Sequence, residues 1–254
     1  ALPSHRQNEI FHYVRSAEAT CLFIPERIKD FDFRQMADAV RAEAPSLQRV
    51  FVLGEARERE ISLNALTASK ADAGDLAAIE RTELDPADVA LMLLSGGTTA
   101  LPKLIPRTHN DYIYNFSQSA RIAGFGPDTV LLLTLPLAHN YNLGSPGMLG
   151  ALALGGRVVI APRGDCNTVF SLVEKERVTN IQAAVPLIVN WLNDPALDRF
   201  DVSSLQVVQQ GGARLSSELR DRLRKRLGCQ FQEDYGTAEG LLNLTRLDDP
   251  DDII

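Results

Sequence analysis

Two glycines, two threonines, a serine and a lysine interrupt an apolar run at residues 91–109, LMLLSGGTTALPKLIPRTH. Glycines let backbone N–H groups approach an anion closely, and hydroxyl and ammonium groups add further donors. The segment SGGTTALPK (95–103) therefore predicts a phosphate-binding loop. It is not a Walker loop, because it lacks the Gly-Lys-Ser/Thr ending and a strand pattern follows it. The simpler alternative is a β-hairpin turn, which the two glycines alone would satisfy.

Three other segments also carry polar groups just after an apolar strand pattern. PLAHNYNLGSPG (136–147) presents His139 and Asn140, QQGGAR (209–214) presents glycines, and EDYGTAEG (233–240) ends near a carboxylate, Glu239. Each has a simpler interpretation alone: a helix cap, a βα turn and a solvated acid. In open α/β sheets, however, ligands bind beyond the carboxyl ends of the strands. The four segments together predict one nucleotide–Mg²⁺ site at one edge of a sheet.

Strand-like and helix-like segments alternate along the first third of the chain. Ser4 is expected to cap a helix that runs to about Ser16, and Asp32 to cap one that ends near Ala44. Apolar strands are predicted at 19–25 and 48–54, whereas the polar, Ala-rich residues 55–87 read as a surface helix and a linker. This βα alternation predicts an α/β fold with mostly parallel sheets flanked by helices.

The alternation continues from residue 88 onwards. A strand at 88–94 is expected to return as an antiparallel strand at 103–109, after which Asn110 caps a helix that runs to about Ile122. Further strands are predicted at 129–136, 157–162, 180–185 and 205–210. Further helices are expected to start at Ser145–Pro146, Asn167, Pro186 and Ser216, the first of them ending at Gly155–Gly156.

Composition limits the kinds of protein this can be. The 254 residues are 45% hydrophobic, and 26 basic against 33 acidic residues give a net charge of −7, which argues against a nucleic-acid binder. The basic run 220–226 reads as the solvated face of a helix. Three scattered cysteines match neither a zinc site nor a disulfide framework, and no apolar run is long enough to span a membrane. We therefore expect a cytoplasmic protein with no nucleic-acid or membrane partner.

The motifs resemble those of the adenylate-forming superfamily, which includes acyl-CoA synthetases, luciferases and adenylation domains. SGGTTALPK resembles its Ser/Thr/Gly-rich signature, and YGTAEG resembles its Tyr-Gly-x-Thr-Glu motif with Ala238 at the usual Thr. LIPRTHNDY, PLAHNYNLGSPGMLG, QQGGAR and YGTAEGLLNLTRLDD are similar to one branch, the stand-alone aryl-acid ligases that make 2,3-dihydroxybenzoate–AMP or salicylate–AMP for siderophores. The resemblance covers essentially the whole chain and implies the core of that family's large N-terminal domain.

The resemblance implies a two-step reaction. A carboxylate attacks the α-phosphorus of ATP to give aryl-AMP and pyrophosphate, and the phosphopantetheine thiol of an aryl or peptidyl carrier protein then takes the acyl group. His139 would close near the reacting carboxylate as a positioning hydrogen-bond donor, Lys103 would serve the phosphates, and Glu239 would hold Mg²⁺. The residues implied to bind ATP are Ser95, Gly96, Gly97, Thr98, Thr99, Lys103, Gly211, Gly212, Ala213, Arg214, Glu233, Tyr235 and Gly236.

The same resemblance implies an acid pocket in which Asn140 bonds the ortho-hydroxyl, Ser145 is a second polar group, and Gly212 and Leu242 are walls. Asp234 departs from the branch, which usually has a small apolar residue there. A buried carboxylate needs a donor, so the substrate could be an aminobenzoate or a protonated heteroaromatic acid such as 3-hydroxypicolinate; alternatively, Asp234 turns away or bonds backbone N–H groups. Glu233 departs too, since many relatives have an amide beside the adenine.

Several family features are not found in the sequence: the ribose-binding Asp, the hinge and the catalytic lysine of a mobile C-terminal domain. We therefore expect a fragment, inactive alone, with a βα-repeat portion and polar linker at 1–84 and a nucleotide- and aryl-acid-binding portion at 85–254. An aryl-CoA ligase remains an alternative. A non-enzyme alternative is a truncated piece that acts only as a structural or binding module.

Overall fold

The structure is a computed structural model that describes residues 1–95 and 101–250. It divides into two compact units, and each is described by itself. Unit 1 comprises Ala1, Pro3–Asp88 and Leu94–Ile105; unit 2 comprises Leu2, Val89–Leu93 and Pro106–Ile254. The domain boundary expected at 84/85 stays a prediction.

Unit 1 is built on a small sheet in the order β1-β4-β5, with both pairings parallel. Its strands are β1 (Cys21–Pro25), β4 (Arg49–Leu53) and β5 (Glu60–Ser62). A separate short hairpin, β2 (Arg27–Ile28) and β3 (Phe31–Asp32), follows β1 in the chain. The helices are α1 (Gln7–Ser16), α2 (Phe33–Glu43), α3 (Leu63–Ala68) and α4 (Ala73–Glu80). The parallel β1–β4 pair confirms the expected βα repeat.

Helix α2 shows why this region folds as the sequence predicts. The Asp32 carboxylate accepts hydrogen bonds from the backbone N–H groups of Arg34 and Gln35, which would otherwise lack partners at the helix start. Two expectations for unit 1 are wrong. Helix α1 begins at Gln7 with Arg6 as its N-cap, not at Ser4. Residues 60–62 form a third parallel strand where a helix and linker were expected.

Unit 2 is built on a six-stranded sheet in the order β13-β12-β11-β10-β8-β9. Every pairing in it is parallel except β12–β13. The strands are β8 (Val130–Leu133), β9 (Arg157–Ile160), β10 (Asn180–Ala183), β11 (Val207–Gly211), β12 (Gln230–Gly236) and β13 (Leu242–Leu244). A separate two-stranded sheet pairs β6 (Val89–Leu94) with β7 (Leu104–Thr108).

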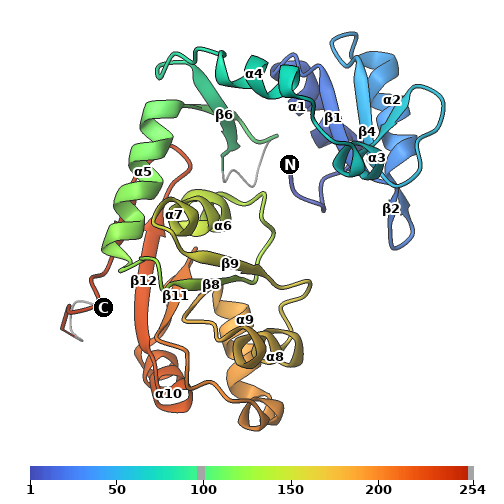
Figure 1. Cartoon of the computed structure of the whole chain (residues 1–254). Helices are drawn as coiled ribbons and strands as arrows, with labels where there is room; N and C mark the ends of the chain where they lie inside the picture. Colours follow the sequence, from blue (N-terminus) through green and yellow to red (C-terminus); the bar gives the residue numbers. More distant parts are fainter. Residues whose placement is uncertain (96–100, 251–254) are drawn as a thin grey trace. The chain divides into compact units, whose positions relative to one another are not determined.

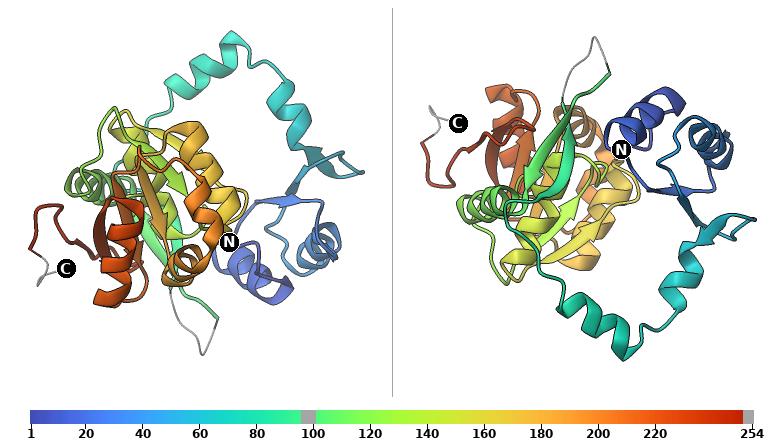
Figure 2. Two further views of the ribbon diagram at one scale, coloured as in Figure 1. Left: turned by 90° about the horizontal axis from the view of Figure 1, so that it is seen from below. Right: turned by 90° about the horizontal axis from the view of Figure 1, so that it is seen from above.

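Helices cover both faces of the six-stranded sheet, as Figure 1 shows and as the other views in Figure 2 make clear. One face packs against α8 (Cys166–Glu176), α9 (Val185–Asn193), α10 (Ser217–Leu227) and the 3₁₀ helix η1 (Pro195–Arg199) around buried Phe170. The other packs against α5 (His109–Ile122) and α7 (Gly147–Ala153) around Leu131 and Leu133. The mixed α/β class, with mostly parallel sheets flanked by helices, is confirmed.

Five helix starts in unit 2 differ from the expected ones. Helix α9 begins at Val185, not Pro186, and α10 begins at Ser217, with Ser216 as its N-cap. Thr108, not Asn110, caps α5, and Asp165 caps α8, which therefore begins at Cys166 and not at Asn167. The helix expected at Ser145–Pro146 begins at Gly147, and a short helix, α6 (Asn140–Gly144), precedes it. Thr and Asp both cap helices well, so neighbouring candidates cannot be ranked from the sequence alone.

A row of buried amides lies on the face of the sheet that α5 and α7 cover. Gln182, Gln209 and Gln232 occupy matching positions on β10, β11 and β12, and all three side chains are fully buried. Gln209 donates to Gln232 over 2.7 Å, and Gln182 donates to the Ser145 carbonyl over 3.0 Å. Because buried amides need specific partners, this row fixes the strand register and ties the sheet to Ser145.

The close packing around Gly147, at the start of α7, can be tested by its effect on stability. Gly147 lies at φ +55°, and a Cβ added there would come within 2.3 Å of the Asn142 carbonyl oxygen. We expect Gly147→Ala to lower the free energy of unfolding by roughly 2–4 kcal/mol, because both backbone strain and the clash oppose the side chain. Urea denaturation followed by circular dichroism measures the change.

Gly126→Ala is the matched control, because a Cβ there meets nothing within 4 Å. It is expected to change the free energy of unfolding by no more than about 0.5 kcal/mol. Equal losses in the two variants would contradict the steric explanation.

Candidate functional site

The parallel sheet of unit 2 brings three of the four predicted segments to one edge. Strands β8, β11 and β12 run in the same direction, so their carboxyl ends lie together. His139 follows β8, Gly211 ends β11, and Asp234 to Gly236 end β12. Of the fourth segment, Gly96, Gly97, Thr98 and Thr99 lie outside the described residues. Ser95 and Lys103 flank them in unit 1, where the Ser95 N–H donates to the Lys103 carbonyl over 3.0 Å.

His139 is the N-cap of α6, so the capping role considered from the sequence is present. The backbone N–H of Tyr141 donates to His139 Nδ1 over 3.2 Å. Partial burial lowers the pKa of the imidazole, which favours the neutral ring. With Nδ1 accepting, the neutral ring carries its proton on Nε2, which makes that atom a hydrogen-bond donor.

The acid-pocket candidates Asn140 and Ser145 lie in one hydrogen-bonded row. Asn140 Nδ2 donates to Ser145 Oγ over 3.0 Å, and its Oδ1 accepts from the Tyr112 hydroxyl over 2.7 Å. Burial raises the pKa of Tyr112 to about 12, so this hydroxyl keeps its proton. The carbonyl end of Asn140 is therefore engaged by Tyr112, whereas Nδ2 retains a second N–H for a ligand.

Tyr112 was not among the residues selected from the sequence. It projects from α5, is buried, and packs closely against Gly144, where a Cβ would lie 2.5 Å from its hydroxyl oxygen. Nothing local in the sequence marks it, because its bond to Asn140 joins residues 28 positions apart.

Asp234 lies near the end of β12, paired with Gly211 on β11, and is only 5% exposed. Neither of its carboxylate oxygens has a hydrogen-bond partner among residues 1–95 and 101–250. Burial raises the pKa of Asp234 to about 7. Asp234 therefore does not bond backbone N–H groups in the described part of the chain, which was one of the two alternatives considered from the sequence.

The residues of unit 2 expected to bind the nucleotide lie at the ends of β11 and β12, on the same edge of the sheet. Tyr235 is 63% exposed, as a platform for a stacked base would be, and Glu233, two residues earlier on β12, is half-buried. Gly212 has φ +89°, a conformation that favours glycine. Leu242 lies over Gly236, where a Cβ would come within 2.6 Å of its side chain.

Arg107 organises the loop that carries Glu239, and sequence reasoning missed it. Its side chain is 2% exposed and donates to the Ala238 carbonyl over 3.0 Å and to the Asp111 carboxylate. Asn115 donates to the Gly240 carbonyl over 2.8 Å. These bonds fix the backbone on both sides of the exposed Glu239. The sequence feature that could have drawn attention to Arg107 is the acidic residue Asp111 four positions later.

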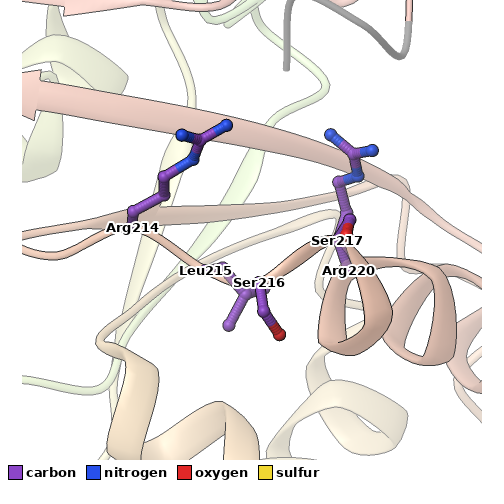
Figure 3. Close-up of a pocket in the computed structure, with 5 residues that line it drawn as sticks. All are labelled: Arg214, Leu215, Ser216, Ser217 and Arg220. Atoms are coloured by element: carbon purple, nitrogen blue, oxygen red, sulfur yellow. The ribbon is translucent and has the colours of Figure 1, made fainter.

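Arg214 lines a different feature, a surface pocket of about 340 Å³ formed with Leu215, Ser216, Ser217 and Arg220. Figure 3 shows the Arg214 and Arg220 guanidinium groups extending to the same side of this segment. Its neighbour Ala213 accepts a hydrogen bond from the Gln210 side chain, which secures the turn after β11. None of the acid-pocket candidates lines this pocket.

Two findings concern metals and membranes. In the described ranges, no three His, Cys, Asp or Glu side chains gather in an arrangement that could hold a metal ion. No helix there is long and apolar enough to cross a membrane.

This fold and edge site define the chain as part of the N-terminal domain of an adenylate-forming enzyme. The sequence profile of the AMP-binding enzymes matches residues 1–253, and the chain belongs to that family. It is 44% identical over 254 residues to the 2,3-dihydroxybenzoate-AMP ligase of Bacillus subtilis, covering 100% of this chain and 46% of that protein.

Two further relatives extend the comparison. A protein described as a salicylyl-CoA synthase / salicylate adenylyltransferase from Streptomyces is 42% identical, over 100% of this chain and 46% of that protein. The apo structure of Mycobacterium smegmatis MbtA superposes with a TM-score of 0.86 at 33% identity, over 98% of this chain and 44% of that one. The chain thus spans less than half the length of each of these three proteins. The expected superfamily and branch resemblance are confirmed.

The Asp234 environment predicts a pH-dependent stability. Its pKa of about 7 in the folded state lies above the ordinary 3.8, so the folded chain binds its proton more tightly than the unfolded chain. The resulting stability is fully present below about pH 4 and is lost as the pH rises through about 7. We expect Asp234→Asn to gain stability relative to wild type across this window, by up to about 4 kcal/mol. Urea midpoints at several pH values measure this.

Asp201→Asn is the control, because bonds from Ser203 and then Arg177 lower the pKa of Asp201 to about 2. The difference in free energy of unfolding between this variant and wild type is expected to stay constant between about pH 5 and 8. A constant difference for Asp234→Asn as well would contradict the buried, unpaired state of that carboxyl.

Proposed function

We propose that this chain forms part of a ligase that activates an aromatic carboxylic acid with ATP, releasing pyrophosphate and giving an aryl-AMP. The observation that carries the proposal is the hydrogen-bonded row of Tyr112, Asn140 and Ser145. It lies at the same sheet edge as Tyr235. A plain nucleotide-binding module would not need such a buried polar row, whereas an aromatic acid needs a few directed polar groups among apolar walls.

The proposal gives each candidate residue a role in that reaction. One carboxylate oxygen of the acid attacks the α-phosphorus, and the bond to the pyrophosphate oxygen breaks. Negative charge that develops on the phosphate oxygens must be stabilised. His139 donates from Nε2 near the reacting carboxylate as a positioning group, and Lys103 with the Ser95–Thr99 segment serves the β- and γ-phosphates.

The adenine side is assigned to the residues that follow β11 and β12. Tyr235 stacks on the base, for which its exposed ring is suited. The Glu233 carboxylate accepts from the exocyclic amine. The remaining contacts come from Gly211, Gly212, Ala213, Arg214 and Gly236. In the acid pocket, Asn140 bonds the ortho-hydroxyl through its second N–H, with Ser145, Gly212, Asp234 and Leu242 around the ring.

Mg²⁺ fits this chain through Glu239. Magnesium is usually held by one or two carboxylates together with substrate phosphates and water, so a dedicated cluster is not required. Glu239 is exposed on a loop whose backbone Arg107 and Asn115 fix, and one such carboxylate meets the requirement. When bound, the ion neutralises charge on the phosphate oxygens.

The second step transfers the acyl group to a thiol. We propose the phosphopantetheine arm of an aryl or peptidyl carrier protein, as in siderophore or nonribosomal peptide biosynthesis. Coenzyme A is the second candidate, favoured by the similarity to a salicylyl-CoA synthase / salicylate adenylyltransferase from Streptomyces. Thioester formation measured in parallel with coenzyme A and with a pantetheinylated carrier protein separates the two thiols.

Pyrophosphate exchange tests the first step. We expect the longest natural protein containing these 254 residues to exchange pyrophosphate into ATP with salicylate or 2,3-dihydroxybenzoate, and not with acetate. Glu239→Gln is expected to lower kcat/KM for the exchange roughly 100-fold, because charge on the phosphates is less well stabilised.

Glu80→Gln, an exposed change on α4, is the matched control and is expected to retain wild-type exchange. Exchange driven by aliphatic acids alone would refute the aryl-acid proposal. Full activity in Glu239→Gln would refute only the role of this carboxylate.

A further inference from the structure

One buried charge in unit 2 is left without use by the reaction described above. Adenylation of a plain hydroxybenzoate needs no carboxylate beside the ring, yet Asp234, which the proposed function assigns to the acid pocket, is only 5% exposed. Neither oxygen has a hydrogen-bond partner within the described ranges. An ionised carboxylate in such a place is costly unless donors reach it.

Other buried charges in this chain have partners. Arg34 in unit 1 is 4% exposed and lies 3.2 Å from Glu60 and 2.7 Å from Glu26. Arg107 in unit 2 pairs with Asp111. Asp234 differs from these groups, which shows that its lack of a partner is not the general state of buried charges in this protein.

The strand neighbours of Asp234 offer its side chain no hydrogen-bond donor. Its strand partners are Gly211 on β11 and Leu244 on β13, so one neighbour has no side chain and the other is apolar. A Cβ on Gly211 would lie 3.2 Å from Tyr141 Cε2, which places that ring over the end of β11. The Tyr141 hydroxyl also has no partner in the described part of the chain. Burial, and then the Asp234 charge, raise the pKa of Tyr141.

We propose that Asp234 selects an aromatic acid that carries nitrogen-bound hydrogens on its ring edge, either a ring amine or a protonated ring nitrogen. This inference rests on the proposed aryl-acid adenylation. A ring amine presents two N–H donors to the two carboxylate oxygens, and a protonated ring nitrogen presents one N–H that carries positive charge. A ring hydroxyl presents one neutral donor and a methyl group none. The Tyr141 hydroxyl is the adjacent polar group that can serve the same substituent.

Matched aromatic acids provide the test, since the ring position that faces Asp234 differs between regioisomers. Pyrophosphate exchange is measured with 3-, 4- and 5-aminosalicylate and with methylsalicylic acids substituted at the same positions. 3-Hydroxypicolinate is compared with salicylate. In the longest natural protein that contains this chain, at least one nitrogen-bearing acid is expected to exceed its matched partner in kcat/KM by about tenfold or more.

Three variants assign the preference to the carboxylate. Asp234→Val is expected to reverse it in favour of the methyl acid, and Asp234→Asn, which keeps the size but loses the charge, to reduce it. Asp201→Asn, a surface change, is expected to keep the wild-type ratio. A wild type that prefers the methyl or unsubstituted acid throughout overturns the proposal, and so does an Asp234→Val variant with an unchanged ratio.

A binding measurement does not depend on turnover. The NMR signal of the Asp234 carboxyl carbon, assigned by its loss in Asp234→Asn, is titrated with pH in the presence of each acid. The nitrogen-bearing acid is expected to shift the titration to lower pH, and the methyl acid is not. An unshifted titration with every nitrogen-bearing acid overturns the inference. Failure of the proposed function appears differently, as no exchange with any aromatic acid in wild type or variants.

Discussion

The parallel pairing of β8, β10, β11 and β12 is the constraint on which the rest of unit 2 depends. Strands that run in one direction present their carboxyl ends at one edge, and the segments after them, far apart in sequence, meet there. The buried amides Gln182, Gln209 and Gln232 hold the register. A slip of one residue would turn these amides into the apolar face that packs on α8, α9 and α10, at a large cost in free energy.

Some buried polar groups at this edge have hydrogen-bond partners and others do not. Arg107 and Tyr112 have all the partners needed to hold the Glu239 loop and the Asn140 side chain in place. Asp234 and the Tyr141 hydroxyl are buried without partners in the described ranges. Satisfied groups make a rigid frame, whereas unsatisfied groups retain hydrogen-bonding capacity for a ligand. The edge therefore combines a preorganised frame with two buried polar groups whose hydrogen-bonding capacity is not used by the described residues.

Much of the fold could be predicted from the sequence, because apolar strands and helix caps are local signals. The β1–β4 repeat and the Asp32 cap were predicted correctly. The errors have a common physical cause. Thr108 displaced Asn110 as a cap, and residues 60–62 became a strand, because pairing partners and packing distinguish between local choices of similar energy.

The sequence by itself determined the α/β class, the family motifs and the placement of His139, Asn140 and Glu239 after strands. Only the tertiary structure decided the rest: the bond from Arg107 to Ala238 across 131 positions, the engagement of Asn140 by Tyr112, and the solitary burial of Asp234. The physical reason is that burial and hydrogen-bond satisfaction depend on which distant segments pack together. A residue type reveals what a side chain can donate or accept, and packing decides whether a partner is there.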